Sequence, residues 1–306
     1  MQFENAVQSI ESIEQKYYYL GRLGKNEWWR YLLSFCIIIF CWLGFSVFLF
    51  IFYYVISMFD NNPLTGMDAN STLNIGSNPL VDLTLGLLSF IPLLLSLFVA
   101  VKFIHRRSVI SLITPLKRID WKRIGLGVLV IWLLVLVSCI TEAISFPGRY
   151  QLTFDSGEFI KFVPIIIIFV PIQAATEELM FRGYLTQSLT LLFKSPWIAI
   201  IISSALFMSL HFANPEVAVD VVLTLAYYFA VGIFMALITL KDNRLELALG
   251  CHIGINTFVL LENYTDSVLP VPSIFTINTL DPVYNLASFV VMAIIFIGFL
   301  HFSKKH

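Results

Sequence analysis

The chain has 306 residues, of which 58% are hydrophobic and only 13% are charged, whereas about 25% of the residues in a soluble domain are charged. This composition excludes an ordinary soluble domain and predicts a membrane protein. The 19 basic residues nearly balance the 20 acidic ones, so no excess of positive charge indicates a nucleic-acid partner.

The first 31 residues are expected to form a cytoplasmic or interfacial segment. They contain both acidic and basic side chains ahead of any long apolar run. Amphipathic aromatic side chains settle at the level of the lipid headgroups. A short interfacial helix is therefore predicted to present Tyr17, Tyr18, Tyr19, Trp28 and Trp29.

Eight apolar runs suited to crossing a bilayer follow. A hydrocarbon core about 30 Å thick is crossed by roughly 20 helical residues. The fourth run is too long for one straight span, and Pro164 and Pro171 are expected to break or kink it. The pattern predicts an all-α polytopic membrane protein with about eight transmembrane helices, at residues 32–57, 83–103, 124–144, 162–192, 197–212, 217–240, 245–261 and 285–302.

The distribution of basic residues predicts the orientation of these spans. Four basic residues lie in the amino-terminal segment and seven between Lys102 and Arg123, whereas the opposite loops hold only Arg149 and Lys161. Cytoplasmic loops carry the excess of Lys and Arg. With eight spans, both termini are predicted to be cytoplasmic.

The first of three polar motifs lies in the fourth run, where Thr176-Glu177-Glu178-Leu179-Met180-Phe181-Arg182-Gly183 interrupts apolar sequence. Ionisable residues at membrane depth are functional candidates by default. On a helix, Glu178 and Arg182 are i,i+4 neighbours that can form an ion pair, while Glu177 is rotated by about 100° and is free for another partner. The alternative is a buried salt-bridge network that only holds helices together.

The second motif is Phe207-Met208-Ser209-Leu210-His211, near the end of the fifth run. A histidine at this place can be a purely interfacial residue. If the fourth and fifth spans form a hairpin that turns near Lys194, however, Glu177 and His211 are each 17 residues from the turn. They then stand at the same height, and a facing Glu and His can activate water.

The third motif is Cys251-His252-Ile253-Gly254-Ile255-Asn256 in the seventh run. His252 and Asn256 share one helical face at i,i+4 spacing. Each can be a hydrogen bond between packed helices, or the two together can stabilise a developing oxyanion. The height of His252 matches that of Glu177 only if the hairpin at Lys194 protrudes from the membrane, which polar Gln187 and Ser188 make plausible.

In chain order, the motifs are Glu-Glu-x-x-x-Arg-Gly, Phe-x-x-x-His and His-x-x-x-Asn, each in a separate run. This order closely resembles the CAAX protease and bacteriocin-processing (Abi) family of intramembrane glutamate proteases, which is related to the type II CAAX prenyl endopeptidases. The resemblance covers about residues 162–261. We therefore expect one transmembrane domain at residues 32–306 with its catalytic core in that stretch.

The resemblance also implies a role for each motif residue. Glu177 would be the general base that, with His211, holds and activates the attacking water. His252 and Asn256 would then stabilise the tetrahedral oxyanion.

Two more residues of the first motif, Glu178 and Arg182, would form the ion pair that orients the motif helix. Gly183 would allow close packing.

The resemblance favours an enzyme without a cofactor. Zinc requires three protein ligands and an open position. Glu177, His211 and His252 could supply the ligands, so zinc stays an alternative. There is no His-Glu-x-x-His motif, and the family mechanism is understood to depend on glutamate without a required metal.

The expected substrate is a membrane-associated peptide or protein, and the lipid bilayer is the other expected partner. The compact size of the chain favours a bacterial plasma-membrane protein in which a monomer suffices.

Two other classes of function stay open from the sequence. One is a non-catalytic scaffold or bacteriocin-immunity protein that binds a peptide in the same cavity. The other is a transporter whose polar residues form an ion path. Glu142, near the end of the third run, lacks a motif partner and is expected to be interfacial.

Overall fold

The computed structural model describes residues 16–59, 79–265, 267–269, 271–278 and 280–303. Helices dominate this part of the chain. Their bounds are α2 (Trp28–Phe59), α3 (Pro79–Leu88), α4 (Phe90–Val99), α5 (Trp121–Ser145), α6 (Ser156–Glu178), α7 (Thr186–Phe193), α8 (Pro196–Ser209), α9 (Val221–Asp242), α10 (Glu246–Thr257) and α11 (Pro282–Ser303).

The fold confirms a polytopic helical membrane protein. In the described residues, six helical stretches are long and apolar enough to cross a membrane. Two of the eight predicted spans, α8 and α10 with the turn that follows it, are apolar but shorter. The six long stretches are Trp28–Val55, Pro79–Ile104, Trp121–Ser145, Ser156–Phe193, Val221–Asp242 and Pro282–His301.

Short 3-10 and π segments connect or extend these helices. The two π segments are η2 (Ala100–Ile104) and η4 (Leu179–Leu185). The 3-10 segments are η1 (Tyr17–Leu23), η3 (Val109–Leu112), η5 (Pro215–Ala218) and η6 (Phe258–Leu260).

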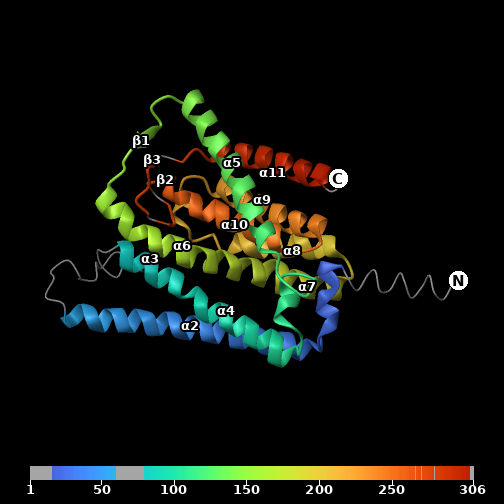
Figure 1. Cartoon of the computed structure of the whole chain (residues 1–306). Coiled ribbons are helices and arrows are strands. Elements are labelled where there is room, and N and C mark those ends of the chain that lie inside the picture. Colours follow the sequence, from blue (N-terminus) through green and yellow to red (C-terminus); the bar gives the residue numbers. More distant parts are fainter. Residues whose placement is uncertain (1–15, 60–78, 266, 270, 279, 304–306) are drawn as a thin grey trace.

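A small sheet that hydropathy did not predict closes one end of the bundle (Figure 1). Its strands are β1 (Tyr150–Leu152), β2 (Glu262–Tyr264) and β3 (Phe275–Ile277), in the order β1-β3-β2. The β1 and β3 strands are antiparallel, and β2 and β3 are parallel. Runs of only three residues carry too little alternation to be recognised as strands.

Helix α10 lies in the middle of the bundle, in contact with α5, α6 and α9 (Figure 1). Glycines allow its close approach to α5. A Cβ atom on Gly250 would lie 2.1 Å from the carbonyl oxygen of Ile124, and one on Gly127 would lie 2.5 Å from that of Leu247. Gly250 and Gly254 form a small-xxx-small pattern, which lets helix backbones meet in membranes. This packing fixes the helix that carries His252.

The long fourth run is not broken at its prolines, and a kink there stays a prediction. Helix α6 continues through both Pro164 and Pro171 to Glu178. The irregularity comes later, where η4 widens the turns from Leu179 to Leu185 before α7 resumes. Such π segments inside helices are frequent at functional sites.

The predicted hairpin between the fourth and fifth runs is present. Lys194 ends α7 in the left-handed conformation, with φ of 55°. Ser195 caps α8 by accepting a hydrogen bond from the Ile198 amide at 3.5 Å, and Pro196 occupies the first helical position, where its missing N–H costs nothing. Helices α7 and α8 then pack against each other.

The hairpin also extends beyond the start of α10, and its protrusion from the membrane stays a prediction. Gly183 lies against Leu112, and the neighbouring Ile113 accepts a hydrogen bond from Leu245, just before α10 begins. The residues after Gly183 therefore pass the start of α10. Gln187 is buried there: it accepts a hydrogen bond from Arg107 at 2.6 Å and donates one to the Ser111 carbonyl at 2.9 Å.

The amino-terminal aromatic residues do not form one interfacial helix, contrary to the prediction. Tyr17 and Tyr18 lie in η1 and are buried, where their hydroxyls donate to the backbone carbonyls of Leu112 and Ala236. Trp28 and Trp29 begin α2 and are exposed. A buried tyrosine needs a partner for its hydroxyl, and backbone carbonyls supply it here.

The close contact between α5 and α10 yields a stability prediction. The substitution Gly127→Ala should lower the free energy of unfolding by about 1–3 kcal/mol, because the new methyl group would overlap the α10 backbone. Gly125→Ala is the matched control on the same helix, since a Cβ there meets nothing within 4 Å. Thermal unfolding of the purified variants in detergent measures the difference, and equal unfolding temperatures would contradict it.

Candidate functional site

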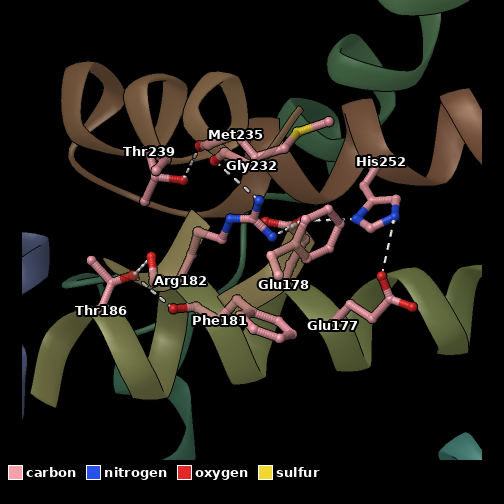
Figure 2. Close-up of polar contacts among 12 residues, drawn as sticks. Glu177, Glu178, Phe181, Arg182, Thr186, Gly232, Met235, Thr239 and His252 are labelled. Atoms are coloured by element: carbon pink, nitrogen blue, oxygen red, sulfur yellow. Dashed lines mark hydrogen bonds and ion pairs between the residues drawn. The ribbon is translucent and has the colours of Figure 1, made fainter. Parts of the chain in front are cut away.

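The centre of the site is a buried carboxylate that accepts two hydrogen bonds. Glu178 Oε1 accepts from Arg182 Nη1 at 2.8 Å and contacts His252 Nδ1 at 2.8 Å (Figure 2). All three side chains are buried, and Glu178 is 0% exposed. The predicted ion pair between Glu178 and Arg182 is therefore present. The third partner, His252, joins α10 to α6.

Arg182 is held on its other sides by α8 and α9. Its Nη2 donates to the carbonyl oxygen of Gly232 at 3.1 Å, and its guanidinium lies 4.6 Å from the centre of the Phe207 ring. A Cβ on Gly232 would lie 2.9 Å from the Cβ of Ser204. The close contact of α9 with α8 thus brings a backbone carbonyl within reach of the arginine.

Glu177 lies one position earlier and points to a different partner, as the helical rotation predicts. Its Oε2 is 3.6 Å from His252 Nε2, the ring nitrogen opposite the one that contacts Glu178 (Figure 2). Its Oε1 accepts a hydrogen bond from Gln173. The buried Oε2 has no hydrogen-bond partner among the described residues, and the side chain is 14% exposed. One carboxylate oxygen of Glu177 is therefore buried beside His252 without a hydrogen bond.

Asn256 reaches Glu177 through one intermediate. Its Nδ2 donates to Gln173 Oε1 at 2.9 Å, and Gln173 in turn donates to Glu177. The sequence reasoning missed Gln173, although it precedes Glu177 by four residues and is polar within an apolar run. That spacing places both side chains on one helical face.

His211 lies in the turn after α8. Its Nδ1 is 2.8 Å from the carbonyl oxygen of Phe207, and its ring stacks on Tyr228 with centroids 4.1 Å apart. The rings of Phe207 and Phe181 are in contact, with centroids 5.3 Å apart. His211 follows Phe207 by four residues, and Glu177 precedes Phe181 by four residues. Each lies about one helical turn from its ring, so His211 and Glu177 stand at the same level.

Glu177 and His211 nevertheless make no direct hydrogen bond or ion pair within the described part of the chain. The histidine that faces Glu177 most closely is His252.

The Nδ1 atoms of both site histidines are engaged, that of His252 by Glu178 and that of His211 by the Phe207 carbonyl. Each ring keeps Nε2, the nitrogen that binds a metal when Nδ1 is held in this way, so the zinc alternative stays untested by these contacts. Across the residues that the structure describes, no group of three or more His, Cys, Asp or Glu side chains is arranged to hold a metal ion.

Two buried acids beyond the motifs lie at a cavity of about 230 Å³ whose wall includes Asn256. Glu216 in η5 was missed because it precedes a span without a motif. Glu142 is buried and pairs with Arg149 at 2.6 Å, and its expected interfacial position stays a prediction.

The fold and this site define a helical membrane protein that holds a Glu-Glu, Arg and His cluster between its spans. Residues 159–258 match the family model described as type II CAAX prenyl endopeptidase Rce1-like. The chain is also 31% identical over 287 residues to the uncharacterized protein YyaK of Bacillus subtilis (strain 168), covering 92% of this chain and 94% of that protein. No solved structure matches.

The chain therefore belongs to the Rce1-like family of type II CAAX prenyl endopeptidases, which confirms the resemblance found in the motifs. The matched stretch includes all six residues singled out from the sequence: Glu177, Glu178, Arg182, His211, His252 and Asn256.

The different surroundings of the two neighbouring glutamates predict different costs of substitution. Glu178→Gln should lower the free energy of unfolding by about 3–5 kcal/mol, because it leaves the buried Arg182 without a counter-charge. Glu177 forms no ion pair with an arginine or lysine in the described part of the chain. Glu177→Gln should therefore lower the free energy of unfolding much less. Chemical unfolding of both variants in micelles makes the comparison, and a Glu177→Gln variant as unstable as Glu178→Gln would refute the assignment.

Proposed function

We propose that the protein is an intramembrane endopeptidase that hydrolyses a peptide bond in a membrane-associated peptide or protein. The observation that carries this proposal is Oε2 of Glu177, which has no hydrogen-bond partner among the described residues and lies beside His252 in a buried polar cluster. Membership of a family of prenyl endopeptidases supports the reaction class.

In the proposed reaction, Glu177 acts as the general base. Its Oε2 takes a proton from a water molecule, the water oxygen bonds to the carbonyl carbon of the substrate, and the C=O electron pair moves to the oxygen. The C–N bond then breaks as the oxyanion collapses, and Glu177 returns the proton to the leaving amine. His211, at the level of Glu177, is proposed to help hold the water.

His252 and Asn256 are proposed to stabilise the oxyanion. Asn256 gives one amide hydrogen to Gln173 and has a second to donate. His252 can donate from Nε2 only when both ring nitrogens carry protons. A positively charged His252 together with Arg182 would balance the charges of Glu177 and Glu178, and a net-neutral cluster is the cheapest to bury.

We further propose that no metal takes part, that one chain contains the whole site, and that both termini are cytoplasmic. The orientation is supported by the clustering of basic residues at the end of the bundle that holds η1. There the backbone amide of Lys25 donates to the His105 carbonyl, and Arg123 Nε donates to Asp242 at 2.6 Å. The sheet end holds only Arg149 and Lys161 among the described basic residues.

The proposal predicts peptide cleavage that depends on Glu177. Glu177→Gln should reduce turnover about 10²–10⁴-fold, because it removes the base and nearly keeps the shape. Glu158→Gln is the matched control, since this glutamate lies on the same helix, α6, and is exposed. Mass spectrometry of the membrane and secreted peptide pools from cells with equal expression detects the fragments.

Fragments formed by wild type and Glu158→Gln but not by Glu177→Gln would support the proposal, and their formation should persist in EDTA. If the cellular phenotype persisted in Glu177→Gln with no fragment changed, the protein would be a peptide-binding scaffold instead. Loss of fragments in EDTA that zinc restores would overturn the metal-free mechanism.

A further inference from the structure

The cavity beside Asn256 extends the proposed active site toward the small sheet. Helices α5, α9, α10 and α11 enclose it, and η5 and β2 contribute to its wall. Two of its lining residues belong to the site already described: Asn256, and Tyr228, whose ring stacks on His211. A substrate bound at Glu177 would therefore have this cavity next to its scissile bond.

The wall of the cavity is acidic. Its four carboxylates are Glu142, Glu216, Glu262 and Asp281. Arg149 compensates two of them, since it pairs with Glu142 at 2.6 Å and with Asp281 at 3.1 Å. No Lys, Arg or His among the described residues lies within ion-pair distance of Glu216 or Glu262.

Of these two acids, Glu216 is the more deeply buried, because it is only 2% exposed. Its Oε1 accepts hydrogen bonds from the Tyr228 hydroxyl and from Asn214 Nδ2, the latter at 3.2 Å. Its buried Oε2 has no partner within the described chain. A buried carboxylate that lacks a cation is costly, so this oxygen is suited to a positively charged ligand.

Glu262 and its neighbours show the same shortage of positive charge. Glu262 accepts from the Tyr150 hydroxyl at 2.9 Å, and burial raises its pKa. Burial and then the charge of Glu216 raise the pKa of Tyr264, which also lines the cavity. A bound cation would lower both pKa values and so counteract both shifts.

We propose that this cavity is a specificity pocket that takes a lysine or arginine side chain of the substrate next to the scissile peptide bond. A volume of about 230 Å³ is below the range of pockets for whole drug-sized ligands and suits one side chain. Ile131, Val135, Ile255 and Met292 line part of the wall and can cover the aliphatic stem of such a side chain. The carboxylates of Glu216 and Glu262 receive its charged end.

A metal ion does not explain the cavity equally well, because the described residues hold no group of three metal-type ligands. The assignment of the positive charge to a substrate side chain rests on the proposed peptidase function. Binding and cleavage are therefore tested separately.

The test measures binding to the full chain carrying Glu177→Gln, in lipid nanodiscs, so that cleavage cannot interfere. The probes are two apolar heptapeptides with blocked ends that differ only at the central residue, lysine in one and norleucine in the other. The lysine peptide should bind about tenfold more tightly, as expected for a hydrogen bond to a charged group. Adding Glu216→Gln or Glu262→Gln should weaken the lysine peptide alone, and adding the exposed control Glu158→Gln should leave both affinities unchanged.

Equal binding of the two peptides would overturn the proposal, and so would a lysine preference that survives both Glu216→Gln and Glu262→Gln. The peptide comparison is made within one folded protein, so an unstable variant does not prevent a decision. If the lysine preference is found but no Glu177-dependent cleavage occurs, the peptidase function fails, and the cavity is a binding site for a cationic side chain rather than a specificity pocket of a peptidase. If cleavage occurs without the preference, only the pocket proposal fails.

Discussion

The structure depends on one buried carboxylate, that of Glu178, whose Oε1 contacts both Arg182 and His252. Arg182 also donates to the α9 carbonyl of Gly232, so the contacts around one oxygen connect α6, η4, α9 and α10. A charged group in an apolar bundle is tolerated only when it is paired and hydrogen-bonded. Because Glu178 takes the structural role, the neighbouring Glu177 keeps an oxygen without a hydrogen bond in the described part of the chain, and this is the atom to which the proposed chemistry is assigned.

This arrangement is possible only because helices approach closely on the other faces. Gly127 and Gly250 bring the α5 and α10 backbones together, and Gly183 does the same for η4 and the Leu112 carbonyl. Helices gain little hydrophobic energy from associating in lipid, so close packing and interhelical hydrogen bonds hold them instead. Two faces of α10 thereby have different tasks: one packs on α5 through glycine, and the other presents His252 to the glutamates.

Local periodicity predicted what lies within one helix. The i,i+4 ion pair of Glu178 and Arg182 and the separate direction of Glu177 follow from the helical turn. Periodicity predicted the contacts between helices less well. His252, rather than His211, faces Glu177 most closely. The distance between helices depends on glycine contacts that are made far away in the chain. A break or kink was expected at the prolines, but α6 is continuous there, and the change to π geometry in η4 follows the glutamates. Gln173 accepts a hydrogen bond from Asn256 of another helix, and Glu216 accepts one from Tyr228, and hydropathy does not reveal these tertiary neighbours.

The most direct test of this account is the protonation of the His252 ring, measured by ¹⁵N NMR of histidine-labelled protein in lipid, with a His252→Gln variant to assign the signals. The account predicts a proton on Nδ1, donated to Glu178, and a second on Nε2 next to Glu177. In Glu178→Gln, the Nδ1 signal should shift. A neutral ring whose Nδ1 carries no proton would contradict the account, because Glu178 would then not hold the histidine.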